Sequence, residues 1–138
     1  MFEHARPPRG EIEAAKHLLV IPAYGSMELT HTVLRDVFGQ PQQPDVVVVD
    51  NAGGYVAIGD EFVIRPKRNL GWAGASNLGF RLAFENGYRT ATTLNNDTRL
   101  STGYFAGLYD SRLPEGIGIL APLYTGGYWK NQATDYSG

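Results

Sequence analysis

The run of four valines from Val46 to Val49 is the strongest constraint on the fold of this chain. β-Branched residues favour strands, and an apolar run without polar alternation is typical of a strand buried on both faces. Residues 17–24 (HLLVIPAY) have the same character, and turn-forming residues end both runs. Such strands belong to parallel sheets, whose two faces are covered by helices.

Helical spacing appears between and after these two runs. The segment from Ser26, a residue type that caps helices, to Gly39, a residue type that ends them, predicts one helix. Its apolar positions are Leu29, Val33, Leu34 and Val37. A second helix is predicted from about Trp72 to Asn86 and ends before Gly87. Its apolar stripe consists of Ala75, Leu78, Leu82 and Ala83.

Further strands are predicted at 61–66, 90–96 and 116–124, with a helix around 102–112. Strands that alternate with helices predict the α/β fold class, with a mainly parallel sheet and helices on both faces. The connection at 51–60 (NAGGYVAIGD) is too short and too rich in glycine for a crossover helix. We expect a tight loop or a single turn there; a turn at Gly53-Gly54 would instead make the neighbouring strand pair antiparallel.

Composition limits the function classes. A chain of 138 residues is long enough for one domain with a core, and its net charge of −2 gives no general attraction to nucleic acid. The absence of cysteine excludes disulfides and thiolate metal sites, and the three histidines are not at metal-ligand spacing. Residues 1–16 carry charges of both signs without an apolar core, which is typical of neither a secretory signal nor a membrane span. We therefore predict a cytoplasmic protein with a leader at 1–16, a domain at 17–124 and a tail at 125–138.

Common nucleotide and nucleophile motifs are missing. The first predicted strand is followed by IPAYGSM rather than the Gly-x-Gly-x-x-Gly turn of dinucleotide-binding folds. The chain contains neither a Gly-x-x-x-x-Gly-Lys run followed by Ser or Thr nor a Gly-x-Ser-x-Gly elbow. Polar side chains nevertheless follow the predicted strands: Tyr24, Asp50 with Asn51, the basic turn 65–68, and Asn95-Asn96-Asp97.

The Asn95-Asn96-Asp97 triplet has two interpretations. Asn and Asp side chains form ordinary Asx turns, but a carboxylate at the carboxyl end of a strand also lies where open α/β sheets bind ligands. A nucleoside diphosphate sugar suits these groups, because a carboxylate such as Asp50 can accept hydrogen bonds from the base or the ribose. Asp97 would then hold a divalent cation, Mg²⁺ or Mn²⁺, against the diphosphate.

Four stretches, VIPAYGS, VVVVDNAGG, RNLGWAGASNLGFRLAFENGY and LNNDTRLSTGYFAGL, resemble successive landmarks of the family 2 glycosyltransferases. The resemblance runs from about His17 to Tyr124 and favours the branch with many rhamnosyl- and galactofuranosyltransferases. It implies the GT-A fold, a nucleotide-sugar donor at the strand ends, and inverting transfer that uses a divalent metal.

The resemblance also implies roles for individual residues. The triplet matches the family's variant of the Asp-x-Asp motif, with Asp97 as the metal ligand and Asn95 and Asn96 beside the diphosphate. The other donor-binding candidates are Pro22, Ala23 and Tyr24 in the first turn, Asp50 and Asn51 at the base or ribose, and Arg68, Asn69, Gly71 and Asn77 around the second helix. For the basic turn that includes Arg68, phosphate contact and a solvated edge remain alternatives.

The chain departs from the family pattern in several places. Gly25 stands where the family usually has Asn, the 51–60 segment is short, and Asn95 replaces the first acid of the motif. Family members continue beyond the point that corresponds to Gly138 and supply a later acid as general base, which inverting transfer needs to take the acceptor proton. The candidate base here is Asp135, in the predicted tail.

Two functional classes remain open. The first is a glycosyltransferase that uses a UDP- or dTDP-sugar and an unidentified acceptor. The second is a non-catalytic nucleotide-sugar-binding module that lacks the general base. A nucleotidyltransferase is disfavoured, because its activating loop needs basic residues and PAYGSMELT has none. Apolar surface left uncovered by a missing second half predicts a homodimer.

Overall fold

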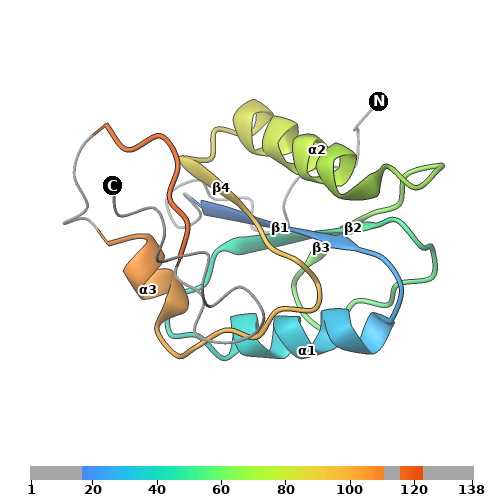
Figure 1. The fold of residues 1–138 in the computed structure, drawn as a ribbon, viewed down its shortest axis with the longest axis horizontal. Helices are drawn as coiled ribbons and strands as arrows, with labels where there is room; N and C mark the ends of the chain where they lie inside the picture. Colours follow the sequence, from blue (N-terminus) through green and yellow to red (C-terminus); the bar gives the residue numbers. More distant parts are fainter. Residues whose placement is uncertain (1–16, 111–115, 123–138) are drawn as a thin grey trace, which may run out of the picture. The chain divides into compact units, whose positions relative to one another are not determined.

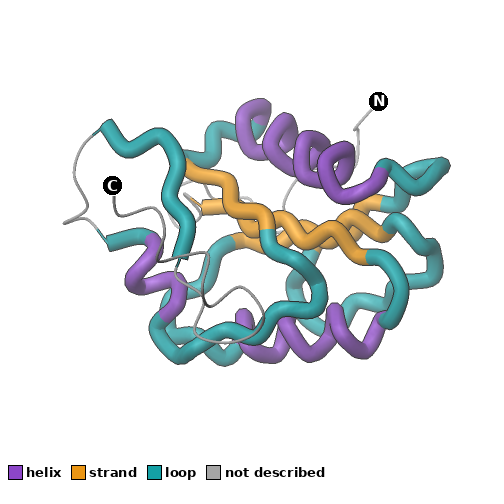
Figure 2. Tube along the Cα trace, viewed as in Figure 1, coloured by secondary structure: helices purple, strands orange, loops and turns teal. Residues whose placement is uncertain are grey.

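The structure is a computed structural model that describes residues 17–110 and 116–122 (Figure 1). The chain divides into two compact units, Met1–Phe105 and Ala106–Gly138. The elements, in chain order, are β1 (His17–Ala23), α1 (Met27–Phe38), β2 (Asp45–Asp50), β3 (Phe62–Ile64), α2 (Gly71–Glu85), β4 (Thr90–Thr93) and α3 (Tyr104–Leu108). Figure 2 shows the strands as one layer between α1 and α2.

The four strands form one parallel sheet in the order β3-β2-β1-β4. The predicted α/β fold class and its mainly parallel sheet are confirmed. The β2–β3 pair is also parallel, so the antiparallel alternative at Gly53-Gly54 is wrong and the expected helix-free loop is present. Both glycines have positive φ, a conformation that lets the chain turn sharply without a helix.

β1 is one of the two interior strands, and its side chains alternate between two cores. Leu18 and Val20 pack with β2 valines against the face of α2 that carries Ala75, Leu82 and Ala83. The alternate positions, Leu19 and Ile21, are equally buried and face the side covered by α1 (Figure 1). The unbroken apolar runs of the sequence are therefore explained by burial on both faces.

Several predicted details differ from the structure. Leu29 is exposed, because α1 turns Thr30 and His31 inward at that level together with Val33, Leu34 and Val37. Ser26 occupies the N-cap position of α1 but makes no side-chain cap bond. The strand predicted at 116–124 is wrong for residues 116–122, which are exposed and irregular, and residues 123–124 lie outside the described residues. The predicted leader 1–16 and tail 125–138 also lie outside them.

Candidate functional site

The order of the strands makes the carboxyl end of β1 a candidate ligand-binding position. The chain moves from β1 to β2 and β3 on one side, then returns to β4 on the other side of β1. Open α/β sheets bind ligands where the strand order reverses in this way, beyond the carboxyl ends of the strands. Here that position lies between the turn after β1, which begins at Tyr24, and the segment after β4, which contains Asn95-Asn96-Asp97.

Asn96 connects these two segments. Its Nδ2 donates to the Tyr24 carbonyl oxygen and to Thr30 Oγ1, each at 3.1 Å. The Leu94 amide also donates to the Val20 carbonyl at 2.9 Å, which continues the β1–β4 ladder into the turn. The amide of Asn96 is thus bonded to the β1 turn and to α1, rather than to backbone two residues further on as in an ordinary Asx turn.

Asp97 is the exposed acid of this site. Within the part of the chain that the structure describes, its carboxylate has no hydrogen-bond or ion-pair partner. The same part of the chain holds no cluster of three or more metal-ligating side chains. A single exposed carboxylate fits Mg²⁺ or Mn²⁺ that is shared with phosphate oxygens, since Mg²⁺ is usually bound by one or two carboxylates plus substrate phosphates. It does not form a complete protein cage.

Asp50 lies at the end of β2, as predicted, but its carboxylate is buried. Oδ1 accepts from the Gly53 amide at 2.8 Å, and Oδ2 accepts from the Tyr55 amide at 2.9 Å. Arg65 Nε lies 3.7 Å from Oδ2. The carboxylate therefore holds the loop between β2 and β3, and direct contact with a ligand would require some of these bonds to be replaced.

Glu61 is a second buried acid in this loop, and the sequence analysis missed it. Its carboxylate accepts from the Tyr55 hydroxyl at 2.6 Å and from the Ile58 and Gly59 amides at 2.7 and 2.8 Å. Burial, followed by the bond to Glu61, raises the pKa of Tyr55 far above its ordinary value. The only available signal was an acid placed directly before an apolar run. The loop between β2 and β3 stands where a crossover helix is usual. Its amides donate instead to two buried carboxylates, those of Asp50 and Glu61.

Asn51 and Asn69 organise the start of α2. Asn51 Oδ1 accepts from the Leu70 amide at 3.0 Å, and its Nδ2 donates to the Gly71 carbonyl at 3.3 Å. Asn69 Oδ1 accepts from the Gly71 amide at 2.8 Å, and Gly71 has φ +67°. These two asparagines bond to backbone and set the path into α2, and a side chain at residue 71 would strain that path.

The remaining predicted donor-binding residues differ in exposure. Pro22 and Ala23 are buried at the end of β1, whereas Tyr24 is 65% exposed beside Asn96. Arg68, near the start of α2, and Asn77, within it, are exposed. Trp72 is 54% exposed, which places it at the surface rather than in the core. The candidate base Asp135 lies outside the described residues.

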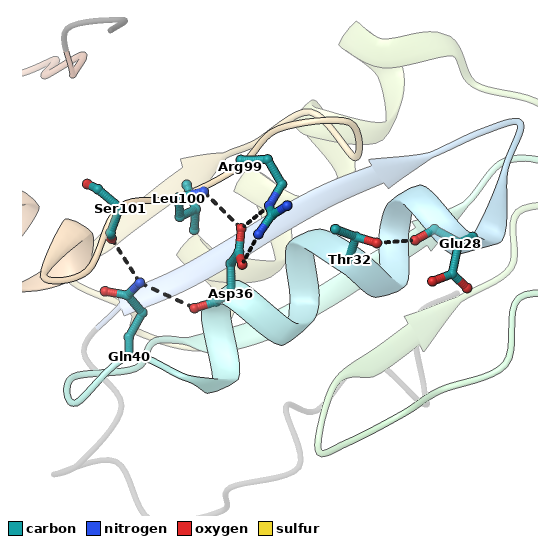
Figure 3. Close-up of polar contacts among 7 residues, drawn as sticks. All are labelled: Glu28, Thr32, Asp36, Gln40, Arg99, Leu100 and Ser101. Carbon is teal, nitrogen blue, oxygen red and sulfur yellow. Dashed lines mark hydrogen bonds and ion pairs between the residues drawn. The ribbon is translucent and has the colours of Figure 1, made fainter. Parts of the chain in front are cut away.

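Polar contacts bind the segment after the triplet to α1 and to Gln40, which follows α1 (Figure 3). Arg99 Nε and Nη2 donate to the two carboxylate oxygens of Asp36 at 2.7 and 3.1 Å, and the Leu100 amide donates to the same carboxylate at 3.0 Å. Gln40 Nε2 donates to the Ser101 carbonyl at 3.0 Å. The bond to Arg99 is the main cause that lowers the pKa of Asp36. α1 therefore determines the path of the chain on both sides of Asp97.

Asp36→Asn is expected to lower the free energy of unfolding by about 1 kcal/mol at pH 7, because Arg99 is exposed and solvent screens part of the ion pair. The folded-state pKa of Asp36 is depressed, so its contribution is present above the unfolded-state pKa and is lost as pH falls through the folded value. The difference between variant and wild type should hence be constant near neutrality and shrink below about pH 4. Urea denaturation at several pH values measures it.

Glu28→Gln is the matched control for Asp36→Asn. Glu28 also forms an ion pair with an arginine, Arg35, but both side chains of that pair are exposed. It should change stability much less than Asp36→Asn. A stability loss in Asp36→Asn that grows toward acid pH would contradict the assignment.

None of the helices in the described ranges is long and apolar enough to cross a membrane.

The sequence model of one family, glycosyl transferase family 2, matches residues 18–112. Two curated relatives, an uncharacterized protein of Mycobacterium bovis and one of Mycobacterium tuberculosis, are each 48% identical over 111 residues. The match covers 80% of this chain but only 42% of each relative, so the chain spans less than half of their length. No solved structure gives a significant match.

Proposed function

Because this chain belongs to glycosyl transferase family 2, we propose that it transfers a sugar from a nucleotide-diphospho-sugar to an acceptor. One observation carries the proposal: the exposed carboxylate of Asp97 lies beyond the carboxyl end of β4, beside the turn after β1, where the strand order reverses. The α/β sheet and the matched family are together consistent with a GT-A-like domain. A UDP- or dTDP-sugar is the proposed donor.

In this proposal, the Asp97 carboxylate would hold Mn²⁺ or Mg²⁺, and Asn95 would contact the diphosphate beside it. The cation, when bound, supplies positive charge that stabilises the departing diphosphate. Arg68 and the amino-terminal end of α2 would lie toward the phosphates, a position favoured by the positive end of the helix dipole, although the Gly71 amide is already bonded to Asn69. Asn77 is retained as a donor contact on the exposed side of the same helix.

The base and ribose are assigned to the side of the site formed by β1 and β2. Tyr24 offers an exposed aromatic ring, and Pro22 and Ala23 set its place at the end of the strand. Asn51 and Asn69 shape the turn into α2, and Gly71 gives that turn its positive φ. Asp50 acts by holding the loop that forms this side of the site, through its bonds to Gly53 and Tyr55.

Inverting transfer breaks the bond between the anomeric carbon and the diphosphate oxygen while the acceptor oxygen attacks from the opposite face. The diphosphate leaves with the bonding electron pair, and the acceptor hydroxyl gives its proton to a base. Asp135 is the proposed base. The second candidate function is a non-catalytic nucleotide-sugar-binding module that lacks this base.

Calorimetric titration with UDP- and dTDP-sugars, in Mn²⁺, in Mg²⁺ and in EDTA, tests donor binding. We expect binding that weakens at least about tenfold when the metal is removed, which corresponds to about 1.4 kcal/mol of binding free energy. The reason is that Asp97 repels the diphosphate when no cation lies between them. Equal affinity in metal and in EDTA, or no binding of any donor, would refute the proposal.

Release of the nucleoside diphosphate from the bound donor separates the two candidate functions. An enzyme with an intact base should release it slowly even with water as acceptor, and Asp135→Asn should abolish that release without weakening donor binding. A binding module should hold the donor intact. The Asp135 variant therefore distinguishes loss of transfer from loss of the site.

A cytoplasmic location and a homodimer remain part of the proposal. Three aromatic side chains on α2 are exposed: Trp72, Phe80 and Phe84, the last by 88%. Apolar surface of this kind favours self-association. Sedimentation velocity on the purified chain measures the oligomeric state.

A further inference from the structure

The amide of Asn96 is directed by two acceptors that come from different elements. Its Nδ2 lies 3.1 Å from the Tyr24 carbonyl oxygen, in the turn after β1, and 3.1 Å from Thr30 Oγ1, in the first half of α1. A backbone carbonyl can only accept, so the nitrogen of the amide must face it. The orientation of Asn96 is therefore determined by its partners.

Thr30 is too deeply buried to contact a ligand, since only 1% of its surface is exposed. Its hydroxyl nevertheless reaches the middle residue of the Asn95-Asn96-Asp97 triplet, 66 residues further along the chain. The residues on either side of Asn96 are exposed, and the side chain of Asp97 has no partner in the described part of the chain. The triplet thus has one side chain directed into the protein and two directed toward solvent.

We infer that Thr30 and Asn96 form a positioning pair that sets the direction of the Asp97 carboxylate toward a cation bound to the nucleoside diphosphate. This inference rests on the proposed function and deepens it. Thr30 is buried and affects the site only through its hydrogen bond to Asn96. Asn96 acts through its amide nitrogen instead of contacting the donor. The pair explains why the metal-binding turn lies against the turn after β1.

Thr30→Val provides the main test, because valine has a similar shape but lacks the hydroxyl that accepts from Asn96. The probe is UDP with Mn²⁺, titrated calorimetrically. Loss of one hydrogen bond that holds the turn should weaken UDP binding in Mn²⁺ by about 3- to 10-fold. Thr30→Ser keeps the hydroxyl and should restore most of the affinity, a rescue that a purely packing role of Thr30 would not give.

Thr32→Val is the matched control. Thr32 lies on the same helix, and its hydroxyl donates to the Glu28 carbonyl at 2.8 Å, within α1 itself (Figure 3). Removing this hydroxyl changes the same chemical group at a similar place but leaves the triplet untouched. UDP affinity in Mn²⁺ should match that of the wild type. Equal affinities for Thr30→Val and wild type would overturn the inference.

Asn96→Asp separates positioning from direct contact by the sign of its effect. A second carboxylate beside Asp97 would strengthen Mn²⁺ binding if residue 96 contacted the cation, because added negative charge raises the affinity of such sites. A positioning residue gives the opposite result, since the new oxygen faces the Tyr24 carbonyl and loses the donor. Weaker Mn²⁺ binding supports the pair, and tighter binding overturns it.

Amide hydrogen exchange of the ligand-free protein tests the pair independently of any binding. The Thr98 amide donates to the Asn95 carbonyl across the triplet, at 3.4 Å. Thr30→Val should accelerate exchange in residues 95–98 relative to wild type and Thr32→Val, and unchanged exchange there would overturn the pair. A wild-type chain that fails to bind UDP with Mn²⁺ would refute the proposed function, and the exchange result would still decide whether the pair holds the turn.

Discussion

Asp97→Asn is expected to weaken UDP binding in Mn²⁺ more than about 100-fold. Asparagine keeps the size of the side chain and one oxygen but removes the charge that holds the cation. Loss of residues that merely support metal ligands already costs about 10- to 100-fold in metal affinity, so loss of the carboxylate proposed to hold the cation should cost more. Calorimetry in Mn²⁺ gives the affinity, and thermal unfolding should show a stability close to wild type, because Asp97 is exposed.

Glu85→Gln is the matched control for Asp97→Asn. Glu85 is also an exposed acid, but it is the last residue of α2. α2 connects β3 to β4, so Glu85 lies before the amino end of β4, whereas Asp97 lies beyond the carboxyl end of that strand. Its variant should bind UDP as the wild type does. If Asp97→Asn retained full affinity in Mn²⁺, the cation would have to bind elsewhere and the proposed site would be wrong.

Gly79→Ala is expected to lower the free energy of unfolding by about 2 to 3 kcal/mol. A Cβ at residue 79 would lie 2.9 Å from the Val20 Cβ and closer still to both Val20 methyl groups. Val20 is fully buried on an interior strand, and its β-branched side chain is restricted at χ1, so it yields little to the added methyl group. The higher helix propensity of alanine offsets only about 1 kcal/mol of this clash.

Two further variants test the cause of that loss. Gly107→Ala places the same methyl group in α3, where it would meet no atom of the described residues within 4 Å apart from its own helix backbone and chain neighbours, and should change stability little. Val20→Ala removes the methyl groups that residue 79 would meet, so the double variant should be less destabilised than the sum of the single variants. Strict additivity of the two losses in urea denaturation would show that the contact with Val20 is not the reason.

The elements of the fold could be predicted from local patterns. The buried run at Val46–Val49 and the helical stripe of Ala75, Leu82 and Ala83 both reflect burial against a neighbour, which spacing alone reveals. The strand predicted at 116–124 failed because an apolar composition does not show whether a neighbouring strand exists. Its residues 116–122 are exposed, and Gly116 has φ +84°.

The candidate site could be located from the sequence, but the partners of its side chains could not. Asn96 and Asp97 are neighbours with similar side chains, and only the structure shows that Asn96 bonds inward while Asp97 is exposed. Asp50 carries the same chemical group as Asp97 yet is buried among loop amides. Partners of this kind are fixed by the path of distant backbone, which no local pattern records.

The long stretch of chain between β2 and β4, which contains β3 and α2, has a consequence for how the protein folds. β1, α1 and β2 are consecutive, whereas the bond between Asn96 and Tyr24 joins residues 72 positions apart. Closing so large a loop costs conformational entropy before the contacts of β4 with β1 compensate for it, which slows such steps. The binding position therefore forms only when β4 pairs with β1. Donor binding would measure the fraction of molecules that have completed folding.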